Sequence, residues 1–195
     1  MPTTGKAIPH DSAVGHVTGQ AWYIEDIPAR EDELVVGFLG SPVAKATLKS
    51  IDVSEALKQP GVIAVYTAND IPGHNIFGAI VADEPFLAEE DLEYKGQPLA
   101  VIAANNPDAI ERAKAAIALE YEEHEPVFTI TQARERKSYL GPHRVIARGD
   151  FEAAFAKAPH KLDGCFENGG QDHFYLENQA CIAIPAEEDQ VKVIS

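Results

Sequence analysis

The sequence predicts an α+β protein, with mixed α/β layers around one core and a β-rich segment after them. Short apolar runs of strand length recur through residues 34–123, and one clear helical pattern stands between two of them. After His160 only strand-like stretches follow. Strands and helices that alternate along a chain are typical of layers packed around a single core.

Length and composition indicate a globular chain. Its 195 residues are enough for one domain of ordinary size, or for one domain and part of another. The formal net charge of −15 would repel phosphates and anionic lipids, so we expect neither nucleic acid nor membrane as a partner. The sequence lacks an apolar run that could span a bilayer, and its start lacks the apolar region of a secretory signal. We therefore expect a cytoplasmic protein.

The first part of the chain is predicted to alternate strands with little helix. Residues 1–33 are polar and turn-rich and are expected to have little structure of their own. A helix of one to two turns is expected at 54–58 before Pro60-Gly61 stops it, and residues 68–97 are expected to be mostly loop. The predicted strands are 34–39 (buried on both faces), 46–53, 62–67, 98–104 (buried) and 119–123 (an exposed edge).

The clearest helix is predicted between the last two of these strands. Asn106 can cap the free N–H groups, Pro107 suits the first helical position, and Asp108 lies favourably at the positive end of the helix dipole. Ile110, with other apolar residues at helical spacing, continues a stripe through Leu119.

The second part is predicted to be β-structure that is incomplete. Residues 127–148 are expected to form a connection with a short helix around 131–137. Strands follow near 161–168, 179–185 and 190–195, with a turn at Gly169-Gly170. So few strands bury little apolar surface alone, and their unpaired edges predict self-association of the chain.

Cysteine and histidine residues give no sign of a metal site. Cys165 and Cys181 are predicted to be two buried thiols in a reducing compartment, in preference to a cross-strand disulfide. The histidines other than His173 are scattered without metal-ligand spacing and are expected mostly at the surface.

Several segments, in order, resemble the large, molybdopterin-binding subunit of the xanthine dehydrogenase and aldehyde oxidase family. Together they cover almost the whole chain from about residue 15 onward. The first segment is Val17-Thr18-Gly19-Gln20-Ala21-Trp22-Tyr23-Ile24-Glu25-Asp26-Ile27-Pro28. The second is discontinuous and consists of Ile51-Asp52, Ala56, Pro60-Gly61-Val62 and Thr67-Ala68-Asn69-Asp70-Ile71-Pro72-Gly73. The others are Asp83-Glu84-Pro85, Gly96-Gln97-Pro98, Glu120-Tyr121-Glu122-Glu123 and Gly169-Gly170-Gln171-Asp172-His173-Phe174-Tyr175-Leu176-Glu177.

The resemblance implies an α+β fold: an α/β hammerhead domain followed by the first β-strands of a molybdopterin-binding domain. It divides the chain into an N-terminal arm (1–15), the hammerhead domain (16–126), a linker (127–148) and an incomplete molybdopterin-binding domain (149–195). Asp83-Glu84-Pro85 and Gly170-Gln171-Asp172-His173 favour the xanthine dehydrogenase branch over carbon monoxide dehydrogenase. The chain is then an N-terminal fragment of the subunit, inactive alone.

The activity that the resemblance implies is oxidative hydroxylation of a purine, from hypoxanthine to xanthine to urate, with water as the oxygen source. Electrons would pass from the molybdenum centre through 2Fe-2S clusters to FAD on other domains or subunits. Expected partners are the remainder of the molybdopterin domain, the iron–sulfur and FAD parts, and the small-molecule substrate. No cofactor is expected to bind the fragment alone.

Gln171 is the main candidate for a cofactor-binding residue. Its amide can donate N–H groups to the oxo and sulfido ligands of molybdenum without adding charge, and Gly169 and Gly170 let the backbone pass close to a bulky group. We expect Gln171→Ala to weaken activity more than Gln97→Ala. His173 and Glu177 are expected to hold the turn by local hydrogen bonds rather than to act as acid and base. Phe174 and Tyr175, which follow in the same segment, are expected to be core or pocket-wall aromatics.

The sequence lacks the residues that perform catalysis in the family. The family's general-base glutamate, substrate-clamping arginine and later pterin loops have no counterpart here, so we expect no catalytic residue and no metal ligand. Two alternatives stay open: an aldehyde oxidase-type hydroxylase, and a stand-alone α+β interaction module without catalysis.

Overall fold

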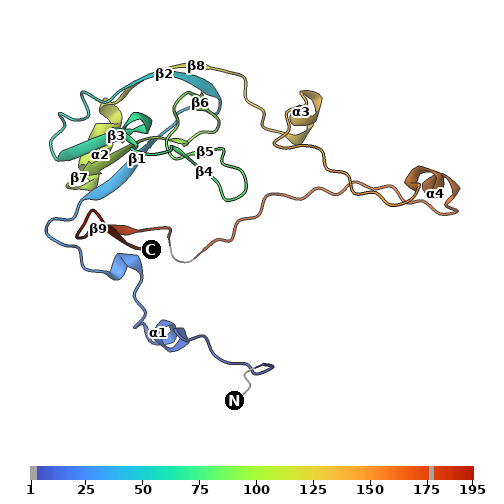
Figure 1. Cartoon of the computed structure of the whole chain (residues 1–195), viewed down its shortest axis with the longest axis horizontal. Coiled ribbons are helices and arrows are strands. Elements are labelled where there is room, and N and C mark those ends of the chain that lie inside the picture. The colour runs from blue at the N-terminus through green and yellow to red at the C-terminus, as the bar shows by residue number, and fades with distance from the viewer. Residues whose placement is uncertain (1–3, 176–177) are drawn as a thin grey trace. The chain divides into compact units, whose positions relative to one another are not determined.

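The structure, a computed structural model, describes residues 4–175 and 178–195 (Figure 1). The chain forms two compact units. The first, called here the 32–146 unit, is Asp32–Ile146; the second, the terminal unit, joins the N-terminal residues through Glu31 with Ala147–Ser195. A helix long and apolar enough to cross a membrane is not found among the described residues.

A three-stranded antiparallel sheet with one helix on it forms the larger core of the 32–146 unit. Its strands are β1 (Val35–Gly40), β7 (Pro98–Ala104) and β3 (Val62–Thr67), with β7 in the centre. Ala100, Ile102 and Ala104 of β7 point to the side of helix α2 (Pro107–Ala116) and are fully buried there. The predicted strands 62–67 and 98–104 are therefore confirmed.

Helix α2 begins where the sequence predicts. The Asn106 side chain accepts a hydrogen bond from Ala109 N at 2.9 Å, and Pro107 is the first helical residue. Ile117 is extended, with φ −75° and ψ 126°, so the helix ends at Ala116 rather than at residue 119. The helix is shorter than the apolar stripe, and the next strand begins at Ala118.

Gly37 on β1 lets α2 lie close to the sheet. A Cβ atom at Gly37 would lie 2.6 Å from Cγ2 of Ile110, so a glycine is needed at this contact. The opposite face of β1 is open, because Val36 and Phe38 are 58% and 60% exposed. The expectation that this strand is buried on both faces is wrong; β1 is an edge strand with cover on one side only.

A second three-stranded sheet lies beside a smaller apolar cluster. It consists of β6 (Asp91–Leu92), β2 (Ala46–Asp52) and β8 (Ala118–Glu123), with β2 in the centre. Leu48, Leu92 and Leu99 are buried in this cluster. Strand β8 is an exposed edge, as predicted from its glutamates.

The segment predicted as loop between β3 and β7 carries three very short strands. These are β4 (Ile76–Phe77) and β5 (Glu84–Pro85), which pair as a hairpin, and β6. A 3-10 helix, η2 (Ala68–Asp70), connects β3 to this region, and the Asp70 carboxylate accepts a hydrogen bond from Thr67 N at 2.7 Å. In Figure 1 the loop beyond β4 and β5 projects away from the two sheets.

Short helices differ from the predictions in both directions. Residues 54–58 form turns rather than a helix, because so short a segment before Pro60-Gly61 cannot propagate one. Helix α3 (Ile130–Glu135) confirms the helix expected around 131–137. Helices α1 (Ala13–Thr18) and α4 (Phe151–Lys157) and the 3-10 helix η1 (Ile24–Asp26) were not predicted.

The β-structure of the terminal unit is smaller than expected. Within the described part of the chain, strands β9 (Ile182–Pro185) and β10 (Val191–Ile194) pair only with each other. Residues 161–168 form no strand and Gly169-Gly170 form no turn, so both of these predictions are wrong. Among the described residues no neighbouring strand pairs with 161–168, and an unpaired strand leaves its backbone groups without partners.

The two cysteines also differ from expectation. Cys165 and Cys181 are free thiols, as predicted, but both are exposed rather than buried. Cys165 lies in the stretch without strand, and Cys181 directly precedes β9.

Candidate functional site

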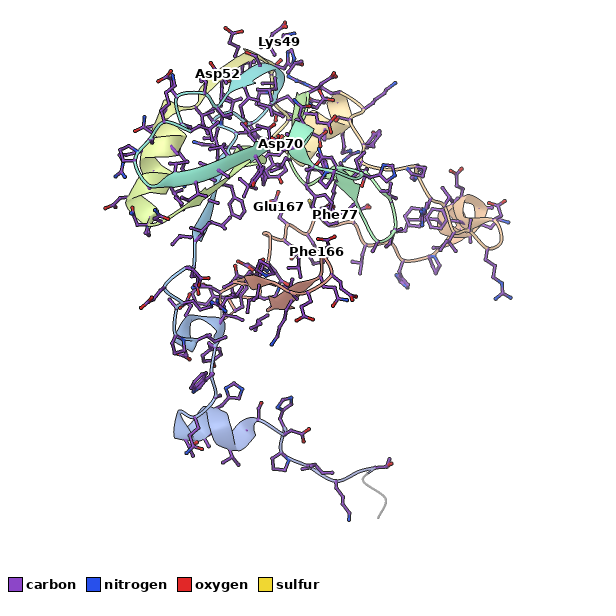
Figure 2. All side chains as sticks on the ribbon, turned by 60° about the vertical axis from the view of Figure 1, so that its left-hand side comes forward. Lys49, Asp52, Asp70, Phe77, Phe166 and Glu167 are labelled. Carbon is purple, nitrogen blue, oxygen red and sulfur yellow. The ribbon has the colours of Figure 1, made fainter. Side chains whose placement is uncertain are left out.

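The segment predicted to contact a cofactor is extended and exposed. Gln171, Gly170 and Gly169 lie in residues 160–175, which form no helix or strand. Figure 2 shows Phe166 and Glu167 on the same bare stretch of chain. Gln171 makes no hydrogen bond to any residue that the structure describes, so its amide is available to a ligand but is not held in one position.

These residues do not by themselves fit a bulky pterin cofactor. A Cβ atom at Gly169 or Gly170 would meet nothing within 4 Å, so no neighbouring group closes around the backbone there. Within the described part of the chain, no group of three or more histidine, cysteine or acidic side chains converges on a metal position. The amide of Gln171 has suitable donor chemistry, but the residues that the structure describes build no cradle for the group.

The neighbours of Gln171 are open to solvent as well. Phe174 is 94% exposed and Tyr175 is 55% exposed, so the expected burial of these aromatics is not found. Phe174 has a φ of 51°, a left-handed conformation that is unfavourable for a bulky side chain. His173 is exposed and forms no hydrogen bond with described residues. Glu177 lies outside the described residues.

The segment of residues 17–28, which resembles the family, forms a local structure in the terminal unit. Thr18 closes α1 with a hydrogen bond from its hydroxyl to Val14 O at 2.7 Å, and Gly19 ends the helix with φ 72°. Tyr23 N donates to the Asp26 carboxylate at 2.9 Å at the start of η1. Farther along, Asn178 Nδ2 lies 3.5 Å from Glu25 Oε1, which joins this motif to the chain just after the Gln171 segment.

Titratable groups with shifted pKa values lie on the surface of the 32–146 unit, and none is placed as an acid or base. The backbone N–H of Ser54 donates to Asp52 at 2.9 Å and lowers the pKa of that carboxyl. Lys49 lies 3.1 Å from Glu122 across β2 and β8 and lowers the Glu122 pKa. Figure 2 shows Lys49 and Asp52 on the same strand. All seven histidines are exposed, as expected for most of them.

One hollow in the 32–146 unit was not predicted. It lies at α3, measures about 420 Å³ and is lined by Thr131, Arg134, Glu135 and Tyr139. It is open to solvent, and no pattern in the sequence singles out these residues. It offers a guanidinium and a carboxylate but no enclosed position for a reacting group.

Two family models match the chain, one for each part. The model described as "Aldehyde oxidase and xanthine dehydrogenase, a/b hammerhead domain" matches residues 18–125. The model described as "Molybdopterin cofactor-binding domain" matches residues 134–195.

Proteins with similar sequences are xanthine dehydrogenases and aldehyde oxidases. A xanthine dehydrogenase of Emericella nidulans is 42% identical over 95% of this chain, and aldehyde oxidase 2 of Macaca fascicularis is 40% identical over 95%. The chain spans 14% of the length of each. The structure of the aldehyde oxidoreductase of Desulfovibrio gigas superposes with a TM-score of 0.80 at 24% identity, covering 95% of this chain and 23% of that one, and shows the same fold.

The chain therefore belongs to the aldehyde oxidase and xanthine dehydrogenase family. The α+β fold predicted from the sequence, a hammerhead domain with the start of a molybdopterin-binding domain, is confirmed.

Proposed function

We propose that this chain supplies the hammerhead domain and the first part of the molybdopterin-binding domain of a xanthine dehydrogenase-type molybdenum hydroxylase. The observation that carries the proposal is the match of both family models in succession along one chain. The identity of 42% to a xanthine dehydrogenase supports it. The domain limits 1–15, 16–126, 127–148 and 149–195 are part of the same proposal.

The reaction proposed for the whole enzyme is hydroxylation of hypoxanthine to xanthine and of xanthine to urate. The molybdenum cofactor, when bound, would supply two-electron oxidation with oxygen from water, and Gln171 is the residue of this chain that would lie beside it. The 2Fe-2S clusters and FAD elsewhere in the enzyme would accept the electrons. Because the chain spans only 14% of the length of these relatives, we expect no xanthine oxidation from the 195 residues alone. Turnover by the purified chain would contradict this.

Within the enzyme we propose that Gln171 lies beside the molybdenum centre, with Gly170 and Gly169 giving its backbone a close approach. The support is chemical: an uncharged N–H donor suits the oxo and sulfido acceptors and does not compete as a ligand. The exposed Gln171 amide is free of described partners and can turn towards such a group. We expect Gln171→Ala to lower kcat/KM for xanthine by about 10- to 100-fold, as is usual for groups that orient a metal site.

The choice of control for Gln171→Ala follows from the structure. Gln97 is only 3% exposed, and its Oε1 accepts a hydrogen bond from Glu93 N at 2.7 Å, so Gln97→Ala would disturb folding. Gln190 is exposed, and its hydrogen bonds to described residues involve only its backbone. Gln190→Ala in the complete enzyme is the matched control, with molybdenum content measured in both variants. Equal activity per bound molybdenum in the two variants would remove Gln171 from the site.

Aldehyde oxidation is the second candidate reaction. It is favoured by the 40% identity to an aldehyde oxidase, which is close to the 42% for a xanthine dehydrogenase. The segments Asp83-Glu84-Pro85 and Gly170-Gln171-Asp172-His173 favour the xanthine dehydrogenase branch over carbon monoxide dehydrogenase, and they do not separate a purine from an aldehyde substrate. Comparing kcat/KM of the complete enzyme for xanthine and for an aromatic aldehyde decides between them; a higher value for the aldehyde would overturn the purine assignment.

The proposed partners are the remainder of the molybdopterin-binding domain, the iron–sulfur and FAD parts, and a purine. A cytoplasmic location is also proposed, because two exposed free thiols suit a reducing compartment. Self-association of the isolated chain remains a prediction. Its edges in β9 and β10 are only four residues long, so sedimentation at rising concentration is the direct test.

A further inference from the structure

The hairpin formed by residues 76–86 exposes five large apolar side chains. Its tip runs from Gly78 through Ala82 between β4 and β5. Ile80 at the tip is 97% exposed. The other exposed large apolar side chains of the hairpin are Ile76, Phe77, Val81 and Phe86.

The base of this hairpin is fixed to the core. Asn75 is buried, its Nδ2 donates to Leu87 O at 2.6 Å, and its Oδ1 accepts from Leu87 N at 3.0 Å. The same Nδ2 donates to Glu89 Oε1 at 2.8 Å. Leu87 itself is only 5% exposed. These bonds hold the two ends of the hairpin together and attach them to the 32–146 unit.

The arms of the hairpin support its shape as well. The rings of Phe77 and Phe86 stack with their centroids 4.8 Å apart, and Figure 2 shows Phe77 on this arm. At the tip, Gly78 has φ 150°, and a Cβ there would lie 1.8 Å from Val81 O. Only glycine permits so tight a turn. The hairpin is therefore a built element with an apolar end, and not an unstructured loop.

We propose that the tip of this hairpin inserts into an apolar pocket with a basic rim, on a folded part of the enzyme outside this chain. Contiguous exposed apolar surface on a fixed element marks an interaction site, and aromatic anchors dominate such contacts. The proposal rests on family membership and on relatives of which the chain spans only 14%, and it does not depend on the proposed reaction.

The negative charge around the tip favours a protein pocket with a basic rim as the partner. Asp83 and Glu84 are exposed on the hairpin, and Glu89, Glu90 and Asp91 are exposed just after it. A second copy would bring the same acidic groups, and a net charge of −15, against them. Anionic lipid headgroups would be repelled in the same way. A protein pocket rimmed by lysine or arginine complements an apolar tip with acidic flanks.

The first test places a photo-crosslinking amino acid at position 80 of the complete enzyme, with position 146 as the matched control. Ile146 is the same residue type and is 103% exposed outside the hairpin. Crosslinked peptides are then mapped by mass spectrometry. We expect position 80 to capture a sequence outside this chain that contains apolar residues with nearby lysine or arginine, and position 146 not to capture that peptide. Capture of a second copy of this chain, capture of the same peptide from both positions, or no capture from position 80 would overturn the proposal.

The second test is amide hydrogen exchange, which does not need turnover. In the complete enzyme we expect the tip amides of residues 78–82 to exchange at least about 10-fold more slowly than in the 195-residue chain, because burial of one large apolar side chain is worth at least that factor. Ile80→Glu should abolish this protection, and Ile146→Glu should preserve it. Equal exchange in enzyme and chain would refute the insertion. If the complete enzyme shows the protection but does not oxidise xanthine, the proposed reaction is wrong and the insertion of the hairpin still holds.

Discussion

Replacement of Gly37 by alanine tests the contact on which the larger core depends. The added methyl group would lie 2.6 Å from Cγ2 and 3.2 Å from Cδ1 of Ile110. Carbon atoms normally pack about 3.5–4.0 Å apart, so the shorter approach is too close by about 1 Å. Ile110 is 4% exposed and β-branched, and it cannot simply swing into solvent. Overpacking of this kind costs about 1–3 kcal/mol.

The expected size follows from two opposing effects. Gly37 does not have a positive φ, so alanine fits the backbone and recovers up to about 1 kcal/mol of strand propensity. The steric cost should still exceed this gain, and we expect Gly37→Ala to lower the free energy of unfolding by about 1–2 kcal/mol. Gly73→Ala is the control, because a Cβ at Gly73 would meet no atom within 4 Å. It should change stability by less than about 0.5 kcal/mol.

A double-mutant cycle with Ile110→Ala identifies the clash. Ile110→Ala alone leaves a cavity under β1 and should cost about 2–5 kcal/mol. It also removes Cγ2 and Cδ1, the two Ile110 atoms that the Gly37→Ala methyl would approach too closely. The double variant should therefore be more stable than the sum of the two changes predicts, by about 1 kcal/mol. Urea unfolding followed by far-ultraviolet circular dichroism gives each value. Strict additivity, or equal effects of Gly37→Ala and Gly73→Ala, would refute the packing of α2 on β1.

Three further changes test other parts of the 32–146 unit. Asn106→Ala should lower the free energy of unfolding by about 1 kcal/mol in urea, because it removes the cap that accepts from Ala109 N at 2.9 Å. The pKa of the Asp52 carboxyl is lower in the folded chain than in the unfolded chain. Its contribution to stability is therefore present above the unfolded pKa and is lost as the pH falls through the folded pKa. In Asp52→Asn, the free energy of unfolding should fall less steeply with pH below about pH 4, as circular dichroism of acid unfolding can measure. Gly78→Ala should speed amide exchange in the hairpin but not in α2, because the added Cβ would collide with Val81 O.

The sequence predicts the elements whose signals are local. Asn106-Pro107 fixes the start of α2, and the β-branched run from Val62 fixes β3, because capping and strand propensity need no distant partner. The exposure of Val36 and Phe38 could not be predicted in this way. A continuous apolar run looks the same in a central strand and in an edge strand with one open face. Helix α4 had a signal that was missed, since the Asp150 side chain accepts a hydrogen bond from Ala153 N at 3.0 Å as its cap.

The candidate site could be identified only by resemblance. Gln171 and its two glycines form no contact that a spacing rule would predict, and Phe174 beside them is 94% exposed. A residue whose role depends on groups outside the chain leaves no local signature in propensity or periodicity. The apolar hairpin was predicted as loop for a related reason. Its glycine and proline residues indicate a turn correctly, but they say nothing of the exposed apolar side chains at its tip.

The two glutamines considered in the sequence give opposite expectations in two assays, which separates structure from function. Gln97 is 3% exposed and accepts a hydrogen bond from Glu93 N. Its loss removes the acceptor of this part-buried hydrogen bond, so Gln97→Ala should cost about 0.5–1.5 kcal/mol of stability in the isolated chain. Gln171 is exposed in that chain, so Gln171→Ala should leave the urea midpoint unchanged while it lowers activity in the complete enzyme. If Gln171→Ala instead destabilised the isolated chain as Gln97→Ala does, the amide would be a structural group, and its placement beside the molybdenum centre would lose its support.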